Sequence, residues 1–320
     1  MDRNPEQLIL GIAQGYEARM LEPFVLSLQR SGYRGRCRIF VEAADVEAQA
    51  YLTAHGIEVE SFNSIYARLQ EASQTLRIPH AMRRFLEYLA LRALAPLATH
   101  GGARARVAYT KIAPLHPAPL RFLFYHACLT GPVGAGVRRV LLMDTRDTIF
   151  QRDPFDYPVP DGGLVVSFEE APWSIGRCDF NREWIRGVYG DKEVRTLAAR
   201  GVYNSGAILG DAAALIVYIR VMIGEIARAA GRRFVPGQGL DQAVHNHLLH
   251  LAPPVPFTSL ANGTAPVVHL SRREEEQLVF SPDGFLLNND GEIVHIVHQW
   301  VRYPDAFASA VAKLRASATP

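Results

Sequence analysis

Short apolar runs alternate with segments of helical periodicity at the beginning of the chain. The runs 8–13, 37–41 and 57–59 are typical of buried strands, and the segments 17–30 and 46–55 between them have helically spaced apolar residues. Strands joined by helices of this kind predict a parallel sheet with crossover helices. The beginning of the chain therefore indicates an α/β fold.

The rest of the chain continues this alternation. A helical segment at 65–97, broken at Pro79, and an apolar helix at 120–129 precede a short apolar run at 140–143. Further strands are predicted at 163–168, 203–209, 255–258, 267–270 and 293–297, and further helices from Asp211 to Ala230 and within 236–250. We find no internal repeat and no linker. We therefore expect residues 1–320 to form one two-lobed domain with a mixed, mainly parallel sheet flanked by helices.

Composition and charge are those of an ordinary globular protein, and they argue against several classes of protein. The 320 residues are 48% hydrophobic and 21% charged, enough for a sizeable core, and the net charge of +2 implies no nucleic-acid partner. Cys37, Cys128 and Cys178 are too far apart to suggest zinc or a disulfide framework. Without a signal-peptide pattern or an apolar run long enough to span a membrane, we expect a cytoplasmic location. The abundance of arginine and alanine suggests a bacterial coding bias.

Two carboxylates directly follow the apolar run 140–143. The stretch VRRVLLMDTRDTIFQRDPFD, residues 137–156, places Asp144 and Asp147 at the end of a predicted buried strand. The carboxyl ends of such strands are where open α/β sheets place their ligands. Two carboxylates together also form a hard oxygen site suited to Mg²⁺ or Mn²⁺. We therefore expect the functional site at this point of the chain.

Several weaker features have both a functional and a plain structural interpretation. Gly15-Tyr16 connects the first strand to a helix, where a nucleotide could lie, but GxGxxG is absent and Gly15 is equally explained as a turn residue. Arg121 and Tyr125 lie four apart on one helix and could face a ligand or simply pack.

Two further segments favour the structural interpretation. The Gly-, Pro- and Arg-rich segment 99–119 is better explained as a solvated connection than as an insertion over a site. Trp173, Asp179 and Trp184 suit a sugar ring, although an amphipathic helix with its tryptophans in the core explains them better.

The order of the motifs resembles the glycosyltransferase A fold. Between residues 8 and 304 the chain has a strand ending in acids, an Asp-Pro pair, Asn204-Ser205-Gly206, a GLDQ helix start and a late histidine, His298. It is most similar to metal-dependent, nucleotide-sugar-using families related to glycogenin and bacterial lipopolysaccharide galactosyltransferases. The resemblance implies a nucleotide-binding half at about 1–156 and a half for donor sugar and acceptor at about 157–320.

In those families an Asp-x-Asp motif and the late histidine hold a divalent cation against the donor diphosphate. Counted back from Asp153, Asp147 matches the second acid, but the first acid falls on Thr145. Either Asp144, one residue further away, takes its place through a bulge at the strand end, or Asp144 points elsewhere and the metal site has fewer ligands. The resemblance therefore implies that Mn²⁺ or Mg²⁺ is bound by Asp144, Asp147 and His298.

The resemblance also implies which residues contact the donor. Arg302 replaces the lysine that follows the late histidine in these families, and a guanidinium suits a phosphate. His295, a rival for the late histidine, lies within an apolar strand pattern and is assigned a structural role. The implied donor-binding residues are Gly15, Tyr16, Arg121, Asp144, Arg146, Asn204, Ser205, Gly206 and Arg302.

The resemblance implies that Asp241 and Gln242 hydrogen-bond the sugar hydroxyls at the reacting centre. Among the other acids, Glu169, Glu170 or Asp179 could activate an acceptor hydroxyl in an inverting reaction. A retaining reaction would require no protein base. A strand turn at 204–206 and a helix N-terminal acid at Asp241 are the structural alternatives.

We therefore hypothesise a hexosyl- or pentosyltransferase that moves a sugar from a nucleotide donor, expected to be a UDP-sugar, to an acceptor. The acceptor is open between a glycan, a lipid-linked sugar, a small molecule and a protein. One alternative is a nucleotide-sugar-binding protein without turnover. Another is a phosphatase of the haloacid-dehalogenase type, because LLMDTRDTIF resembles its Asp-x-Asp-x-Thr motif, although here two residues separate the acids and the motif lies mid-chain.

Overall fold

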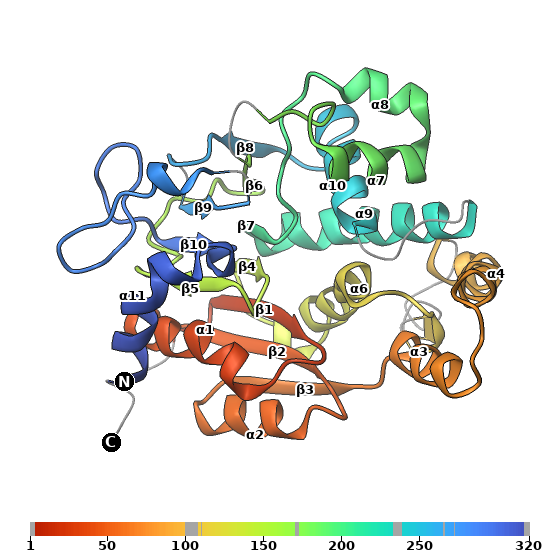
Figure 1. Ribbon diagram of the computed structural model, residues 1–320, viewed down its shortest axis with the longest axis horizontal. Coiled ribbons are helices and arrows are strands. Elements are labelled where there is room, and N and C mark those ends of the chain that lie inside the picture. Colours follow the sequence, from red (N-terminus) through yellow and green to blue (C-terminus); the bar gives the residue numbers. More distant parts are fainter. Residues whose placement is uncertain are drawn as a thin grey trace.

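The computed structural model describes residues 4–99, 108–109, 111–169, 173–232, 239–264, 266–271 and 273–316. Its centre is a seven-stranded sheet in the order β3-β2-β1-β4-β7-β6-β8, and a three-stranded sheet in the order β5-β10-β9 lies beside it (Figure 1). The strands are β1 Gln7–Ala13, β2 Arg36–Glu42, β3 Glu58–Phe62, β4 Arg139–Met143, β5 Thr148–Phe150, β6 Leu164–Ser167, β7 Ala207–Asp211, β8 Phe257–Leu260, β9 Val267–His269 and β10 Ile296–His298.

Most neighbouring strands of the large sheet are parallel. The strands β3, β2, β1 and β4 pair in parallel, as do β6 and β8, whereas β7 runs antiparallel to both β4 and β6. The predicted α/β fold with a mixed, mainly parallel sheet is therefore confirmed.

The helices are α1 Ala18–Arg30, α2 Val46–Ala54, α3 Ile65–Thr75, α4 His80–Thr99, α6 Pro117–Thr130, α7 Asp179–Tyr189, α8 Asp191–Leu197, α9 Ala212–Arg232, α10 Leu240–Leu251 and α11 Pro304–Ala316. Three 3₁₀ turns, η1 Pro132–Gly134, η2 Glu275–Gln277 and η3 Trp300–Arg302, complete the described elements. The predicted break at Pro79 separates α3 from α4. Residues 100–107 and 110 of the basic segment 99–119 lie outside the described residues.

Three predictions from the sequence were wrong in detail. The strand predicted at 203–209 begins at Ala207, because the amide of Gly206 donates to Oδ1 of Asn204 at 2.8 Å and closes a turn there. The strands predicted at 255–258 and 293–297 begin later, as β8 and β10. The C-terminal helix α11 was not predicted.

The alternation of side chains along β1 divides the core into two layers. Leu8 and Leu10 belong to the cluster that contains the buried faces of α6, α9 and α10, whereas Ile9 belongs to the cluster formed with α1 and α2. Successive residues of a strand point to opposite faces, so a fully apolar strand needs helices on both sides. Among the described residues, no helix is long and apolar enough to cross a lipid bilayer.

Candidate functional site

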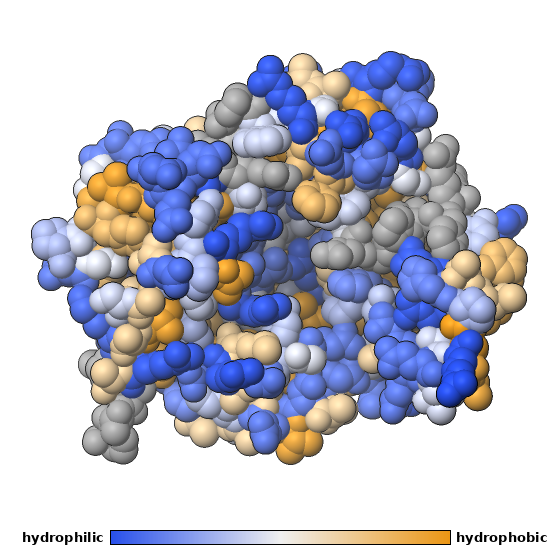
Figure 2. Space-filling model, viewed as in Figure 1, coloured by the Kyte–Doolittle hydropathy of each residue, from blue (hydrophilic) through white to orange (hydrophobic). Residues whose placement is uncertain are grey.

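A cavity of ≈ 880 Å³ lies at the carboxyl ends of β1 and β4. Strands β2 and β4 lie on opposite sides of β1, so the order in which strands are added to the sheet reverses at β1. Such a reversal leaves a crevice outside the carboxyl ends of the strands. Figure 2 shows the molecule hollowed near its centre, with hydrophilic residues gathered around the hollow. The volume lies within the range of about 300–1,000 Å³ that is usual for small-molecule sites.

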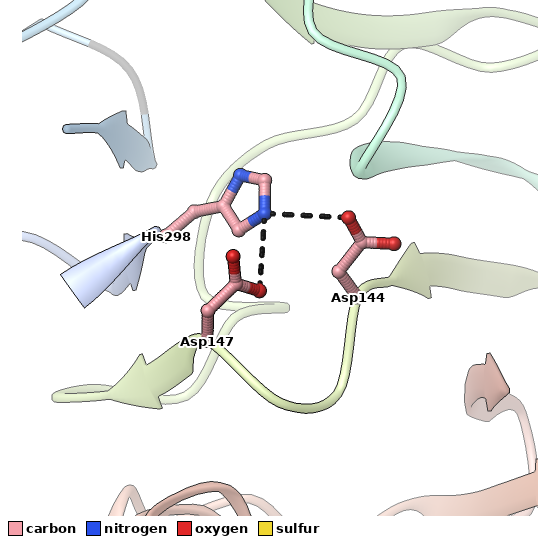
Figure 3. Close-up of side chains that lie close together, drawn as sticks. All are labelled: Asp144, Asp147 and His298. Carbon is pink, nitrogen blue, oxygen red and sulfur yellow. Dashed lines mark ion pairs between the residues drawn. The ribbon is translucent and has the colours of Figure 1, made fainter. Parts of the chain in front are cut away.

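Three predicted metal ligands meet on one wall of this cavity. Oδ2 of Asp144 and Oδ1 of Asp147 each lie 3.5 Å from Nε2 of His298 (Figure 3). One ligand atom from each of the three residues lies within 4.8 Å of the other two. Two carboxylates and an imidazole form a donor set that suits Mn²⁺ and related divalent cations.

The turn after β4 explains how acids three residues apart share one site. The hydroxyl of Thr148 donates to the backbone oxygen of Asp144 at 2.6 Å and closes this turn. Thr145 faces the other way, since its buried hydroxyl donates to the backbone oxygen of Ile12 at 2.9 Å. Both carboxylates therefore face the cavity, and the wider spacing of the acids is compatible with a two-carboxylate site.

His298 and Asp147 are brought together by the small sheet. In the antiparallel pair of β10 and β5, His298 lies opposite Thr148, the residue after Asp147. The amide of Gln299 donates to the backbone oxygen of Asp147 at 2.7 Å. Gln299 has a φ of 68°, in the left-handed region that non-glycine residues seldom adopt. Residues of the C-terminal part of the chain therefore hold the turn that carries Asp144 and Asp147.

The residues at this point fit a divalent cation. The buried Nε2 of His298 has no hydrogen-bond partner among the described residues, and it faces the two carboxylates. A Cβ on Gly206 would lie 2.5 Å from Oδ2 of Asp144 and 2.6 Å from Cε1 of His298, so glycine keeps this space open. The orphaned nitrogen and the open space indicate a site built for an ion between the three side chains.

The charges of the group are strongly coupled. Burial by itself lowers the pKa of His298, but the carboxylates of Asp147 and Asp144 outweigh burial and raise this pKa to about 9. Burial by itself raises the pKa of Asp144, but Arg121 and His298 outweigh it and lower this pKa to about 2. The metal-free protein therefore holds an imidazolium beside two carboxylates, and a metal ion would replace the imidazolium proton.

A second histidine orients His298 from behind. Nδ1 of His298 lies 2.9 Å from Nδ1 of His269, and Nε2 of His269 lies 2.8 Å from the hydroxyl oxygen of Ser167. Asn262 fixes His269 through two hydrogen bonds to its backbone, each 2.8 Å long. Burial lowers the pKa of His269 well below its usual value, so this ring is neutral and can accept the Nδ1 proton of His298. That hydrogen bond leaves Nε2 of His298 as the ligand atom.

Replacing His269 with leucine is expected to weaken Mn²⁺ binding by about 10- to 100-fold, because His298 loses the partner that fixes its tautomer and ring angle. Asparagine at the same position keeps an acceptor near Nδ1 and is expected to restore most of the affinity. Titration of Mn²⁺ followed by electron paramagnetic resonance measures both. Equal affinity in the folded leucine variant and the wild type would exclude this role for His269.

Arg121 links the metal ligand Asp144 to Asp241 of α10 and to the turn before β7. Its buried guanidinium donates to Oδ1 of Asp144, to Oδ2 of Asp241 at 2.8 Å and to the backbone oxygen of Ser205 at 2.9 Å. Burial by itself lowers the pKa of Arg121, but Asp144 and Asp241 outweigh it, so that the pKa is raised. One side chain of α6 therefore orients a carboxylate from β4 and another from α10.

The turn before β7 is held by the side chain of Gln242 on α10. Oε1 of Gln242 accepts the amide of Ser205 at 2.8 Å, and Nε2 of Gln242 donates to the backbone oxygen of Tyr203 at 3.0 Å. Nδ2 of Asn204 donates to Oε1 of Glu169 at 3.0 Å. Because β7 is antiparallel to β4, this turn lies beside Asp144, whose amide donates to the backbone oxygen of Gly206 at 2.8 Å.

Basic and aromatic side chains form the outer part of the cavity. Exposed Arg146 and Arg302 line it, and the guanidinium carbon of Arg146 lies 6.0 Å from the ring centre of Tyr16. Trp184 lines the cavity beside the start of α10. Gly239 is required there, because it has a φ of 82° and a Cβ on it would collide with the Trp184 ring.

Two solved glycosyltransferases match this chain at low sequence identity. The galactosyltransferase LgtC, solved in complex with donor and acceptor sugar analogs, is 13% identical, with 98% of this chain and 96% of that chain covered and a TM-score of 0.47. The glycosyltransferase GlyE of Streptococcus pneumoniae TIGR4 is 13% identical with a TM-score of 0.40, and the match covers 80% of this chain and 45% of that chain. No protein-family model matches the chain, and no curated protein does so at a significant level. We therefore argue the function from the geometry of the site.

Most of the predicted site residues line the single cavity described above. They are Tyr16, Arg121, Asp144, Arg146, Asp147, Glu169, Asn204, Ser205, Gly206, Asp241, Gln242, His298 and Arg302. Of the possible sugar-binding residues, Trp184 lines the cavity, but Trp173 and Asp179 do not.

Gly15 is the exception among the predicted donor-binding residues. It does not line the cavity, and its amide donates to Oδ2 of Asp45 at 2.6 Å. Its φ of 69° is that of a turn glycine, which was the structural alternative. His295 also lies outside the cavity, where its ring contacts Tyr157.

Sequence reasoning missed several residues of the cavity. Gln14 follows β1, His116 caps α6 by accepting the amide of Ala118 at 3.2 Å, and Gln299 follows His298. Gln299 could have been predicted because it directly follows His298, which the sequence analysis had identified. His269, which lies behind His298 rather than in the cavity wall, was also missed, and its signal in the sequence is a histidine within the apolar strand predicted at 267–270.

Proposed function

We propose that this protein is a glycosyltransferase that uses a nucleotide-sugar donor, a UDP-sugar first of all, and a divalent cation. One observation carries the proposal. The Asp144, Asp147 and His298 group shares a cavity of ≈ 880 Å³ with the buried Arg121 and Asp241 pair. A cation site beside neutral and acidic hydrogen-bonding groups suits a ligand with a diphosphate at one end and hydroxyls at the other.

The cation, when bound, neutralises charge on the departing nucleoside diphosphate. Asp144, Asp147 and His298 would hold it. Arg146 and Arg302 are the cavity's exposed cations, and their guanidinium groups are suited to phosphate oxygens. We assign them to the diphosphate, whose developing charge they would stabilise together with the cation.

The inner wall suits the donor sugar. Asp241 is buried, and Arg121 fixes one of its oxygens at 2.8 Å, so that the carboxylate is oriented before a ligand binds. Asn204 and Glu169 are oriented by their mutual hydrogen bond of 3.0 Å. Gln242 holds Asn204 in position, because the oxygen and the nitrogen of its side-chain amide both bind the backbone on either side of Asn204. We assign Asp241, Asn204 and Glu169 to the sugar hydroxyls, since fixed acceptors select hydroxyl-bearing ligands strongly.

A thermal-shift screen of nucleoside diphosphates and nucleotide sugars, with and without Mn²⁺, tests the proposal. We expect the melting temperature to rise with a UDP-sugar, and more so with Mn²⁺, because a ligand that binds only the folded state stabilises it. If no nucleoside diphosphate stabilises the protein under either condition, the proposal is wrong. Release of the nucleoside diphosphate then separates transfer or donor hydrolysis from binding without turnover.

The phosphatase alternative has the geometry against it. Its motif would make Asp144 the attacking carboxylate, yet Oδ1 of Asp144 is bound to Arg121 and Oδ2 faces His298. A carboxylate held on both oxygens is a poor nucleophile. We therefore expect no release of inorganic phosphate from simple phosphoesters.

A further inference from the structure

Helix α4 presents its apolar face to solvent. Met82, Phe85, Leu86 and Leu89 are spaced as i, i+3, i+4 and i+7 and therefore form one stripe, which we call the α4 stripe. Their side chains are 53%, 51%, 50% and 43% exposed. Large apolar residues that gather in one exposed patch mark an interaction surface, whereas scattered ones are usual on any protein.

The opposite face of α4 is fixed on the body of the molecule. Leu91, Leu94 and Ala98 belong to, or pack against, the core cluster that contains α9. Glu87 lies on this inner face, where it is buried and approaches Arg83 at 3.6 Å. Because these contacts fix the rotation of the helix, the apolar stripe remains outside.

Exposed arginines lie at both ends of the stripe. Residues 65–99 contain five arginines and two glutamates, an excess of three positive charges, and one of the two glutamates is the buried Glu87. Arg77 and Arg92 are exposed at either end of the stripe. Apolar residues on one face of a helix with arginines beside them are typical of helices that lie in the interface of an anionic membrane.

The neighbouring helix α3 connects this surface to the cavity. Tyr66, Ala67 and Gln70 of α3 line the cavity, and Figure 1 places α3 next to α4 at one end of the molecule. Figure 2 shows hydrophobic residues along the edge where Figure 1 places α4. A surface bound at α4 therefore lies at the same end of the molecule as the α3 wall of the cavity.

We propose that the α4 stripe docks on an anionic lipid bilayer and that the acceptor is a sugar carried by a lipid in that bilayer. The second part rests on the function proposed above; the first does not. A second copy of the chain fits the surface less well, because two facing copies would bring excess positive charge together, whereas anionic headgroups would neutralise it.

Co-sedimentation of the full chain with vesicles tests the docking without any measurement of activity. Vesicles of phosphatidylcholine with phosphatidylglycerol are compared with vesicles of phosphatidylcholine alone. The test variant is F85S/L86S, and the matched control is L251S/F285S, in which a leucine and a phenylalanine that are 42% and 39% exposed are changed elsewhere. Arg92→Glu is compared with Arg195→Glu on α8, which is also exposed.

We expect the wild type to sediment with anionic vesicles and much less with neutral ones. F85S/L86S should weaken this binding at least about tenfold through the loss of buried apolar area. Arg92→Glu should weaken it at least about fivefold, since each basic residue at an anionic surface contributes about that factor. Both control variants should bind as the wild type does, and all four should melt at the wild-type temperature because the changed residues are exposed.

Three results would overturn the docking. They are a wild type that stays in the supernatant, an F85S/L86S variant that binds like the wild type, and a concentration-dependent dimer that F85S/L86S alone dissociates. Failure of the docking while a UDP-sugar still stabilises the protein would leave the proposed function intact. Docking without nucleotide-sugar binding would reject the proposed function and the lipid-linked acceptor together, while the membrane surface would remain.

Discussion

Replacing Asp147 with asparagine is expected to abolish the metal dependence of donor binding and to lower the rate of sugar transfer by about 10²- to 10³-fold. The change keeps the size of the side chain but removes the charge that faces Nε2 of His298 at 3.5 Å. Affinity for Mn²⁺ should fall by more than the roughly 100-fold that loss of a supporting residue behind a metal ligand can cause. Thermal shifts with UDP, with and without Mn²⁺, measure the effect.

The matched control for this variant is Asp156→Asn. Asp156 is an exposed acid of the same stretch and does not line the cavity. It should keep the full metal-dependent shift. The fold of Asp147→Asn should also persist, because the backbone oxygen of residue 147 still accepts the amide of Gln299. A metal-dependent shift that is unchanged in Asp147→Asn would remove Asp147 from the site.

Replacing Arg121 with methionine is expected to lower the free energy of unfolding by about 3–5 kcal/mol, because it leaves the buried carboxylate of Asp241 without its cation and removes one partner of Asp144. Arg121 is 5% exposed and contacts both Asp144 and Asp241, and Asp241 is 4% exposed. Urea unfolding at neutral pH measures the loss. Adding Asp241→Asn to the Arg121→Met variant should restore part of the stability, since one of the unpaired charges is then removed.

Arg182→Met is the matched control for the Arg121 experiment. Its ion pair with Asp179 is 2.6 Å long, but the Asp179 side chain is 81% exposed. Water replaces such a partner, so we expect a loss of no more than about 1 kcal/mol. A similarly small loss in Arg121→Met would show that Arg121 does not act as the buried link between Asp144 and Asp241. Failure of Asp241→Asn to restore any stability would show that the unpaired Asp241 carboxylate is not the cause of the loss.

Local patterns were sufficient for the frame of the molecule and for part of the site. Fully apolar runs such as 8–13 can be satisfied only by helices on both faces of a sheet, and this alternation predicted the parallel sheet. Acids directly after such a run lie at its carboxyl end whatever the rest of the fold, so Asp144 and Asp147 could be placed. The sequence could not show the order of the strands, because strand neighbours are chosen by packing between distant segments.

The α/β layers, the position of the acids after β4 and the residue types available for a metal and a donor thus follow from local sequence patterns. That Asp144 shares the site with Asp147 follows only from the folded chain, because it depends on Thr145 turning towards Ile12. The same holds for the link through Arg121, the support of His298 by His269 and the outward apolar face of α4. The physical reason is the same in each case. A side chain's neighbours across 23 to 133 residues depend on strand register and helix rotation, which no local pattern specifies.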